Sequence, residues 1–285
     1  MSCLVKNTDN YRMLSQVFSP PMFDKIVRGD DFSDFIYKIN NYYSEHTELS
    51  NKEIIVKLYT DLILKYRCEY IYKNQLFNQI VEEHGLEDTL TLNELKIATS
   101  KADLTLLNGV IRVYEIKTEL DGLFKLEKQL NDYQKFADKV YIVTNEPFSL
   151  KLLSIYRNSN IGIIVFAKNN KLSILKDAHE NDKYFDFSTI FKILRKKEYL
   201  DLVQYNFNYI PNVSNTKIFR TCYDLLSTVD ILKFQKQVLD ILKNRKLESI
   251  ENLKSNNTPY ELKHICNSLN FNEFEYQKLY NFLDK

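Results

Sequence analysis

This chain lacks several features that would assign it to a membrane, secreted or motor class of protein. No apolar run approaches the roughly 18 residues that a transmembrane helix needs, and residues 1–10 contain no apolar signal-peptide segment. No phosphate-binding loop of the GxxxxGKS/T kind is present, so any ATP-driven motor would be a separate chain. The sequence therefore predicts a cytoplasmic protein without a membrane partner.

Cysteine is scarce, and charge of one sign is not in excess. The four cysteines have no paired spacing, so the sequence suggests neither a disulfide framework nor a zinc site. The net charge of +1 argues against a polycationic coating protein but not against a local basic groove. The four histidines show no spacing typical of a metal-ligand set. These residues are Cys3, Cys68, Cys222, Cys266, His46, His84, His179 and His264.

Apolar side chains, by contrast, are abundant enough for a sizeable core, at 44% of residues. Their spacing predicts a short helix at 32–39 and helical structure over 51–84, as one long helix or two, with Gly85 as the stop. A polar linker at 177–183 is the best boundary in the chain. We predict a helical N-terminal region at 1–74, an α/β core at 75–176 and a helical C-terminal region at 184–285.

The predicted core is a mixed β-sheet flanked by helices. Residues 102–107 and 110–117 read as strands around Asn108-Gly109, a strong hairpin signal. An apolar stripe from Leu123 to Ala137 follows at helical spacing. Further elements are expected as a strand at 139–144, a helix at 146–156, a buried strand at 161–166 and an edge strand at 171–175.

Acidic and basic side chains fall where this hairpin could serve phosphodiester chemistry. Such hydrolysis needs a cation that neutralises phosphoryl charge and activates water, with carboxylates to hold the cation. Asp103 on one strand and Glu115 on the next supply carboxylates, and Lys117 can orient the water and stabilise the transition state. Glu115 and Lys117 are two residues apart, so a strand points both to one face and Ile116 to the other.

The next helix adds two polar side chains. Gln129 and Tyr133 are four residues apart, so they share a helix face and could reach a phosphate or a base. Each signal is weak on its own, because Glu-x-Lys triplets are common in a chain with 27% charged residues. Gln129 could be a helix flank, and Tyr133, which lies on the apolar stripe, could be pure core.

The hairpin geometry tests this site. A strict two-residue turn at Asn108-Gly109 places Asp103 opposite Tyr114, on the wrong face for a shared ion. A three-residue loop with Gly109 in the left-handed conformation places Asp103 opposite Val113 instead, and diagonal to Glu115 on one face. We therefore predict an odd-length loop or a bulge.

Taken together, these residues resemble the PD-(D/E)XK nuclease superfamily, in particular the RecB-type branch with a Q-x-x-x-Y helix. The order ELxI…ADLTLLNG…YEIKTELDGLFKLEKQLNDY also resembles a group of small bacterial proteins that join this core to a helical C-terminal region. The similarity covers about 75–144 and weakens toward Arg245. One departure is Ala102, which stands where the superfamily pattern has proline. The residues that carry the resemblance are Asp103, Glu115, Ile116, Lys117, Gln129 and Tyr133.

The resemblance implies a restriction-endonuclease-like core and a Mg²⁺- or Mn²⁺-dependent nuclease. It implies nucleic acid as the partner, DNA rather than RNA, and a homodimer as one working form. The alternatives are a non-cleaving nucleic-acid-binding module and a protein-interaction component of a bacterial defence system. By residue, it implies metal ligation by Asp103, Glu115 and the Ile116 carbonyl, action of Lys117 on the water, and substrate positioning by Gln129 and Tyr133.

The superfamily usually adds one upstream acid. Glu94 fits that place best, and Glu82 and Glu83 are rivals. Lys101 and Asp121 flank the site and either bind backbone phosphate or are simply solvated. Farther along the chain, two basic clusters could grip phosphates or could be solvated helix faces. They are Arg195-Lys196-Lys197 and Lys243-Asn244-Arg245-Lys246, with Phe191, Tyr199 and Tyr205 nearby.

Overall fold

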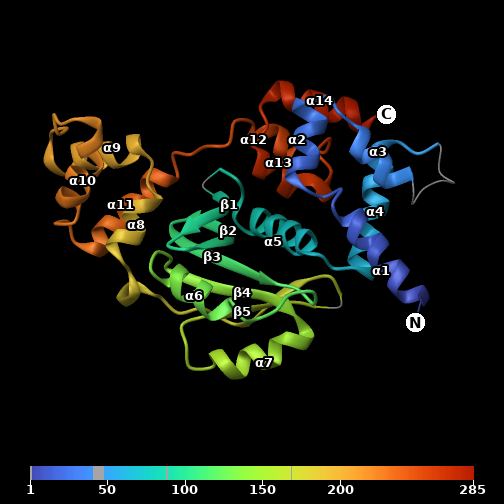
Figure 1. Cartoon of the computed structure of the whole chain (residues 1–285), viewed down its shortest axis with the longest axis horizontal. Coiled ribbons are helices and arrows are strands. Elements are labelled where there is room, and N and C mark those ends of the chain that lie inside the picture. The colour runs from blue at the N-terminus through green and yellow to red at the C-terminus, as the bar shows by residue number, and fades with distance from the viewer. Residues whose placement is uncertain (1, 41–47, 88, 168) are drawn as a thin grey trace.

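We describe a computed structural model of the chain, which covers residues 2–40, 48–87, 89–167 and 169–285. His46 lies outside these ranges, and the side chain of Cys3 is also outside the described part. Figure 1 shows a central sheet with one helical lobe at each end of the molecule. The helices before the sheet are α1 (Ser2–Ser15), α2 (Pro20–Arg28), α3 (Ser33–Asn40), α4 (Asn51–Lys65) and α5 (Glu69–His84).

The helical stretch expected over 51–84 is two helices. Ser50 and Glu53 form a capping box at the start of α4. The chain leaves helical geometry at Tyr66, and the Arg67 guanidinium then donates to the Ala167 carbonyl (3.2 Å) and to Asn170 Oδ1 (2.9 Å). This anchoring to the sheet fixes the break between α4 and α5. The stop at Gly85 and the short helix near 32–39 are as predicted.

The sheet has six strands in the order β1-β2-β3-β4-β5-β6. The first three strands and the last pair are antiparallel, whereas β3, β4 and β5 run parallel through helical crossovers. The mixed α/β architecture is therefore confirmed, although the first strand was not expected. The bounds are β1 (Leu90–Ile97), β2 (Ser100–Asn108), β3 (Val110–Lys117), α6 (Leu126–Gln134), β4 (Lys139–Asn145), α7 (Glu146–Tyr156), β5 (Gly162–Phe166) and β6 (Leu172–Lys176).

The β2–β3 hairpin has an odd-length turn, as predicted, but in a different register. Asn108 pairs with Val110, and Gly109 between them adopts a φ of +67°, which favours glycine. The last pair is Leu104 with Tyr114. The same register continued by one residue sets Asp103 level with Glu115, so the expected pairing of Asp103 with Val113 was wrong by two positions.

Helices cover both faces of the sheet. On one face, α6 and α7 contribute Leu130 and Leu152 to a core with Val113 and Ile142. On the other face, α5 packs against the side chains that alternate with these, such as Ile116. The site residues therefore lie between two hydrophobic layers that hold the strands in place.

The segments after the sheet pack into two different cores. Helices α8 to α11 share a core with α6, and Gln235 donates to Asp138 (3.1 Å) at that junction. Helices α12 to α14 pack with α1 to α5, and Arg28 pairs with Glu275 (2.6 Å). The bounds are α8 (Phe187–Ile193), α9 (Lys196–Phe207), α10 (Asn215–Leu226), α11 (Ile231–Leu242), α12 (Ile250–Lys254), α13 (Lys263–Leu269) and α14 (Glu273–Leu283).

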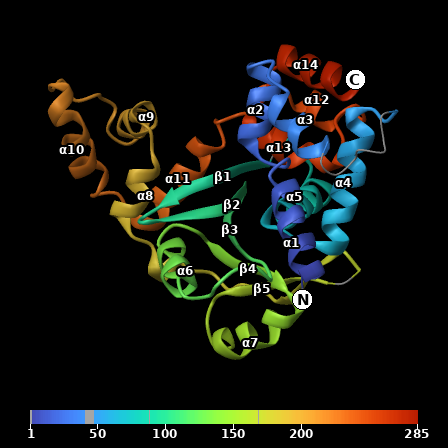
Figure 2. The same cartoon turned by 45° about the vertical axis from the view of Figure 1, so that its right-hand side comes forward.

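The two lobes are visible in both views, with α8 to α11 at the left and the red helices beside the blue ones at the upper right (Figures 1 and 2). The two lobes do not coincide with the regions predicted from the sequence, because helices of 184–285 contribute to both lobes. That the predicted regions are separate domains stays a prediction. Across the described ranges, the chain contains no helix with the length and apolar character required to cross a membrane.

Candidate functional site

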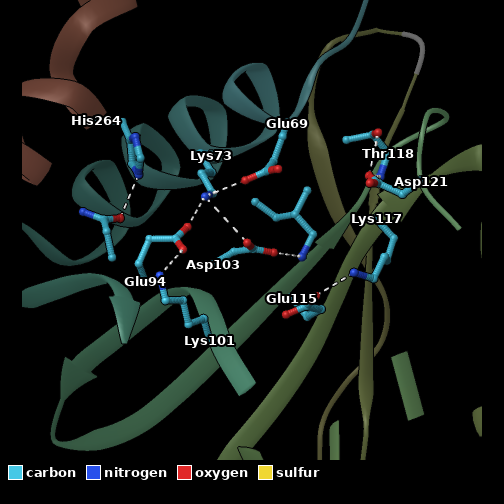
Figure 3. A network of polar contacts seen from close by, with 12 residues as sticks. Glu69, Lys73, Glu94, Lys101, Asp103, Glu115, Lys117, Thr118, Asp121 and His264 are labelled. Atoms are coloured by element: carbon cyan, nitrogen blue, oxygen red, sulfur yellow. Dashed lines mark hydrogen bonds and ion pairs between the residues drawn. The ribbon is translucent and has the colours of Figure 1, made fainter. Parts of the chain in front are cut away.

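Three carboxylates from three different elements meet beside the sheet. Glu69 lies in the first turn of α5, Glu94 on β1 and Asp103 on β2. One oxygen from each lies within 4.8 Å of the others, which is a spacing that can hold a metal ion. Figure 3 shows these carboxylates turned toward one another, with Glu115 and Lys117 on the neighbouring strand.

A lysine occupies the middle of this acid cluster. Lys73 Nζ lies 2.6 Å from Glu69, 2.9 Å from Glu94 and 3.6 Å from Asp103. Its side chain is only 11% exposed. Burial lowers the pKa of Lys73, but the surrounding carboxylates outweigh burial and hold that pKa above its ordinary value. The Lys73 ammonium therefore stays charged and offsets part of the negative charge of the three carboxylates.

Glu94 has an unusual backbone. Its φ is +53°, a left-handed conformation that is uncommon for residues other than glycine. The flanking register pairs Asn93 with Leu104 and Leu95 with Ala102, so Glu94 stands opposite Asp103. Strain of this kind costs about 1–3 kcal/mol and tends to occur at functional sites. The fold therefore holds this carboxylate next to Asp103 despite a local backbone cost.

Asp103 is the most buried acid of the cluster. Its Oδ2 accepts a hydrogen bond from the Ile116 backbone N–H (2.7 Å), and its side chain is 17% exposed. Burial and then the nearby Glu115 charge raise the pKa of Asp103 to about 7, against the opposing effect of Lys73. Ile116 thus reaches the site through its N–H, while ligation by its carbonyl stays a prediction.

Glu115 is the centre of a second network. Its Oε1 accepts from Lys117 Nζ (2.6 Å) and from Gln129 Nε2 (2.5 Å), and its Oε2 accepts from the Tyr133 hydroxyl (2.6 Å). Burial raises the pKa of Glu115, and the three donors moderate that rise. Tyr133 also lies 2.7 Å from the Lys101 carbonyl. The four residues that the sequence placed near one another are therefore in direct contact.

The other candidate residues lie at varying distances. Lys101 is exposed, with its Nζ 4.0 Å from Glu94. Asp121 accepts from the Thr118 N–H (2.9 Å) and hydroxyl (2.8 Å), so it caps the turn after β3. Glu82 and Glu83 are exposed near the end of α5, roughly 20 Å along the helix from Glu69. The structure therefore places neither rival in the cluster.

Sequence reasoning did not single out Glu69 and Lys73, which the structure places in the acid cluster. Their i, i+4 spacing on the helix before β1 is a signal that could have suggested a shared face. The spacing alone does not show that this face meets Glu94 and Asp103, because that depends on how α5 lies across the sheet.

A cavity of about 430 Å³ opens beside the acid cluster. Glu69, Lys73 and Glu94 line one side, and His264 from α13 lines another. His264 Nε2 lies 2.8 Å from Asn93 Oδ1, and burial lowers the pKa of His264 to about 3. The neutral imidazole therefore fixes Asn93, the residue beside Glu94, against the C-terminal helices.

The basic clusters are partly committed to the fold. Arg245 donates twice to Glu198 (2.7 Å each), and Lys196 donates to Asn215 (2.8 Å). Tyr205 is 72% exposed, whereas Phe191 and Tyr199 are buried and stacked on each other. Arg245 thus serves the lobe core, and binding of nucleic acid by these clusters stays a prediction.

Comparison with known proteins identifies the family. A family model described as bacteriophage P4 protein cII matches residues 64–266. The chain belongs to the bacteriophage P4 cII family. Protein cII of Enterobacteria phage P4 is 27% identical over 180 residues, which are 61% of this chain and 66% of that relative. The similarity thus spans slightly less than two thirds of the relative, and no solved structure matches this cII-family chain.

This result corrects the family suggested by the sequence motifs. The PD-(D/E)XK assignment was wrong, because the matching family model is that of cII and no nuclease family matches. The matched range includes α5, the whole sheet and the first part of α13, up to Cys266. The acid cluster, the Glu115 network and His264 all lie within the region that defines membership of the cII family.

Proposed function

We propose that this protein is a metal-dependent hydrolase of phosphodiester bonds in nucleic acid, with DNA as its substrate. The observation that carries the proposal is the acid cluster of Glu69, Glu94 and Asp103 next to the Glu115–Lys117 pair, at the edge of a cavity. Both groups lie at the same end of the β2–β3 hairpin. The proposal rests on these side chains and on no activity of a relative.

The side chains fit a divalent cation. Three carboxylates from three elements surround one point. Among the described residues, Lys73 is the only cation inside this cluster, and Lys101 Nζ lies at its margin, 4.0 Å from Glu94. The cluster therefore carries excess negative charge that one ammonium does not balance. Carboxylate oxygens suit Mg²⁺ and Mn²⁺. Asp103 and Glu94 on the strands, together with Glu69, would hold the ion, and Lys73 would move aside.

When bound, such an ion neutralises phosphoryl charge and lowers the pKa of an attacking water. The protein's own contribution starts at Lys117, whose Nζ is held 2.6 Å from Glu115 and can donate to a phosphate oxygen or to the water. Glu115 is in turn fixed by Gln129 and Tyr133. Gln129 Oε1 is buried and has no hydrogen-bond partner in the described ranges, so it can accept from a substrate or a water.

We also propose that the sheet and its helices form a restriction-endonuclease-like core. An antiparallel hairpin that leads into parallel strands through α6, with acids on adjacent strands, is consistent with a restriction-endonuclease-like core. The chemistry proposed above requires only the observed positions of the side chains.

The test is cleavage of single- and double-stranded DNA and RNA with Mg²⁺, Mn²⁺ or EDTA. We expect metal-dependent cutting of DNA that is lost in Lys117→Met and in Asp103→Asn. Lys128→Met is the matched control, because Lys128 is exposed on α6. Far-UV circular dichroism verifies that each variant is folded. Cutting that survives equally in Lys117→Met would refute the proposed role of this site.

One observation favours a second candidate, a non-cleaving nucleic-acid-binding module. Lys73 pairs with Glu69 and Glu94, and each oxygen of Glu115 accepts a hydrogen bond, so these side chains also form a connected polar network without a metal ion. Inert wild-type protein that binds DNA with no response to metal ions would support this module over the hydrolase.

A further inference from the structure

A second cavity lies on the opposite face of the sheet from the Glu115 network. It has a volume of about 240 Å³ and is bounded by the last turns of α5 and by β3, β4, β5 and β6. Arg112 lines it and is three positions before Glu115 on β3, so the two side chains point to opposite faces. The cavity is therefore separate from the candidate active site.

Two cations stand side by side in this cavity. Arg112 and Lys139 are register partners on the parallel strands β3 and β4, so their backbones are about 4.8 Å apart. Tyr114 and Tyr141, two residues farther along the same strands, line the same cavity and stack with ring centroids 5.4 Å apart. Arg112 and Lys139 therefore lie on the same face of the sheet as the stacked rings of Tyr114 and Tyr141.

The Arg112 guanidinium is unpaired in the part of the chain that the structure describes. Within the described residues it forms no hydrogen bond or ion pair, and its Nη1 is buried and unsatisfied. A buried, unpaired donor of a charged group is costly, so such groups usually meet an acceptor. The guanidinium is a planar fork that suits an oxyanion with two oxygens in its plane.

The acids around the cavity do not supply that acceptor. Asp177 accepts from the Tyr141 hydroxyl (2.5 Å) and from the Ala178 N–H (2.8 Å), and lies 4.0 Å from Lys139. Glu83 is exposed and accepts from Gln79 (2.8 Å). His84, which also lines the cavity, is exposed as well. Asp177 therefore contacts Lys139 and Tyr141, and neither Asp177 nor Glu83 pairs with Arg112 in the described part of the chain.

We propose that this cavity binds a small oxyanion, phosphate or the phosphate group of a small phosphomonoester, between Arg112 and Lys139. Pockets for drug-sized ligands usually exceed about 300 Å³, so a cavity of 240 Å³ suits a smaller group. The stacked tyrosines flank the ligand and close one side of the site. This inference does not depend on the proposed hydrolase activity.

The test is calorimetric titration of the full chain with inorganic phosphate, in a phosphate-free buffer. We expect saturable binding that is roughly ten- to a hundredfold weaker in Arg112→Met, the range for loss of a charged hydrogen bond. Arg112→Lys keeps the charge but loses the fork, so its affinity should lie between the two. Lys171→Met is the control, because this exposed residue does not line the cavity.

Removal of an unpaired buried cation should not unfold the protein, and thermal denaturation without phosphate verifies this. Equal affinity of wild type and Arg112→Met for phosphate would overturn the proposal. Wild-type protein that shows no binding of phosphate would also overturn it. Binding only of a 5′-hydroxyl oligonucleotide, without inorganic phosphate, would likewise overturn it in favour of a nucleic-acid backbone contact. A terminal phosphomonoester that binds more tightly than inorganic phosphate would support it and identify the ligand class.

Discussion

The substitution Lys73→Met tests whether the acid cluster is a cation site. Methionine keeps the apolar stem and removes the ammonium from among Glu69, Glu94 and Asp103. Glu69 and Glu94 are about half exposed, so each of their ion pairs contributes at most about 1 kcal/mol. Asp103 is 17% exposed and is left as a poorly compensated charge. Breaking a buried pair costs about 3–5 kcal/mol, so this mixed case should cost about 2–4 kcal/mol.

The assay is urea denaturation at pH 8, above the Asp103 pKa of about 7, where Asp103 is ionised. We expect the loss in Lys73→Met and a change below about 0.5 kcal/mol in the control Lys96→Met, which alters an exposed residue of β1. Addition of Mn²⁺ at 100 times its Kd for Lys73→Met should then stabilise this variant by about 2.7 kcal/mol in total, and should stabilise wild type by less. A variant as stable as wild type, or one that Mn²⁺ does not stabilise, would show that these acids do not form a cation site.

Three further perturbations probe neighbouring groups. Since burial lowers the His264 pKa to about 3 from 6.5, the unfolded state binds a proton that the folded state does not between these values. Stability should therefore fall by about 1.4 kcal/mol per pH unit below 6.5, and urea denaturation of His264→Gln should show a flatter pH profile. Tyr133→Phe removes a donor to buried Glu115, so it should cost about 1–3 kcal/mol in denaturation, whereas an unchanged midpoint would contradict the observed contact. Glu94→Gly should be about 1 kcal/mol more stable than Glu94→Ala, because glycine adopts a positive φ without the steric cost that a Cβ adds. Equal midpoints would argue against backbone strain.

Local patterns were sufficient for much of the core. Asn108-Gly109 predicted the hairpin, and the requirement that Asp103 and Glu115 share one face of the sheet predicted an odd-length turn, which the structure has. The register still differed from expectation, because both odd-length alternatives satisfy the alternation of side chains. The geometry of the turn around Gly109 decides between these two registers, and the alternation of apolar and polar residues does not determine that geometry.

Tertiary contacts account for what was missed. The strand β1 carries Asn93, Glu94 and Lys96 among its apolar residues, so its alternation is weak and only pairing with β2 makes it a strand. Lys73 looks like an ordinary helix-surface lysine until α5 is laid against the sheet. Hydrophobic periodicity identifies the apolar face of each helix but not its partner, so the division of 184–285 between two cores was not foreseen.

The hydrogen bond between Asn93 and His264 has a consequence for the order of events during synthesis. The two residues are 171 positions apart in the chain. At the usual rate of translation, the ribosome needs roughly 10–35 s to pass from one to the other. During that interval β1, which carries Glu94, cannot pack against α13, and Asn93 has no hydrogen bond from His264. The carboxylates are therefore synthesised well before their surroundings are complete, and the candidate catalytic edge reaches its final structure only after His264 has been synthesised.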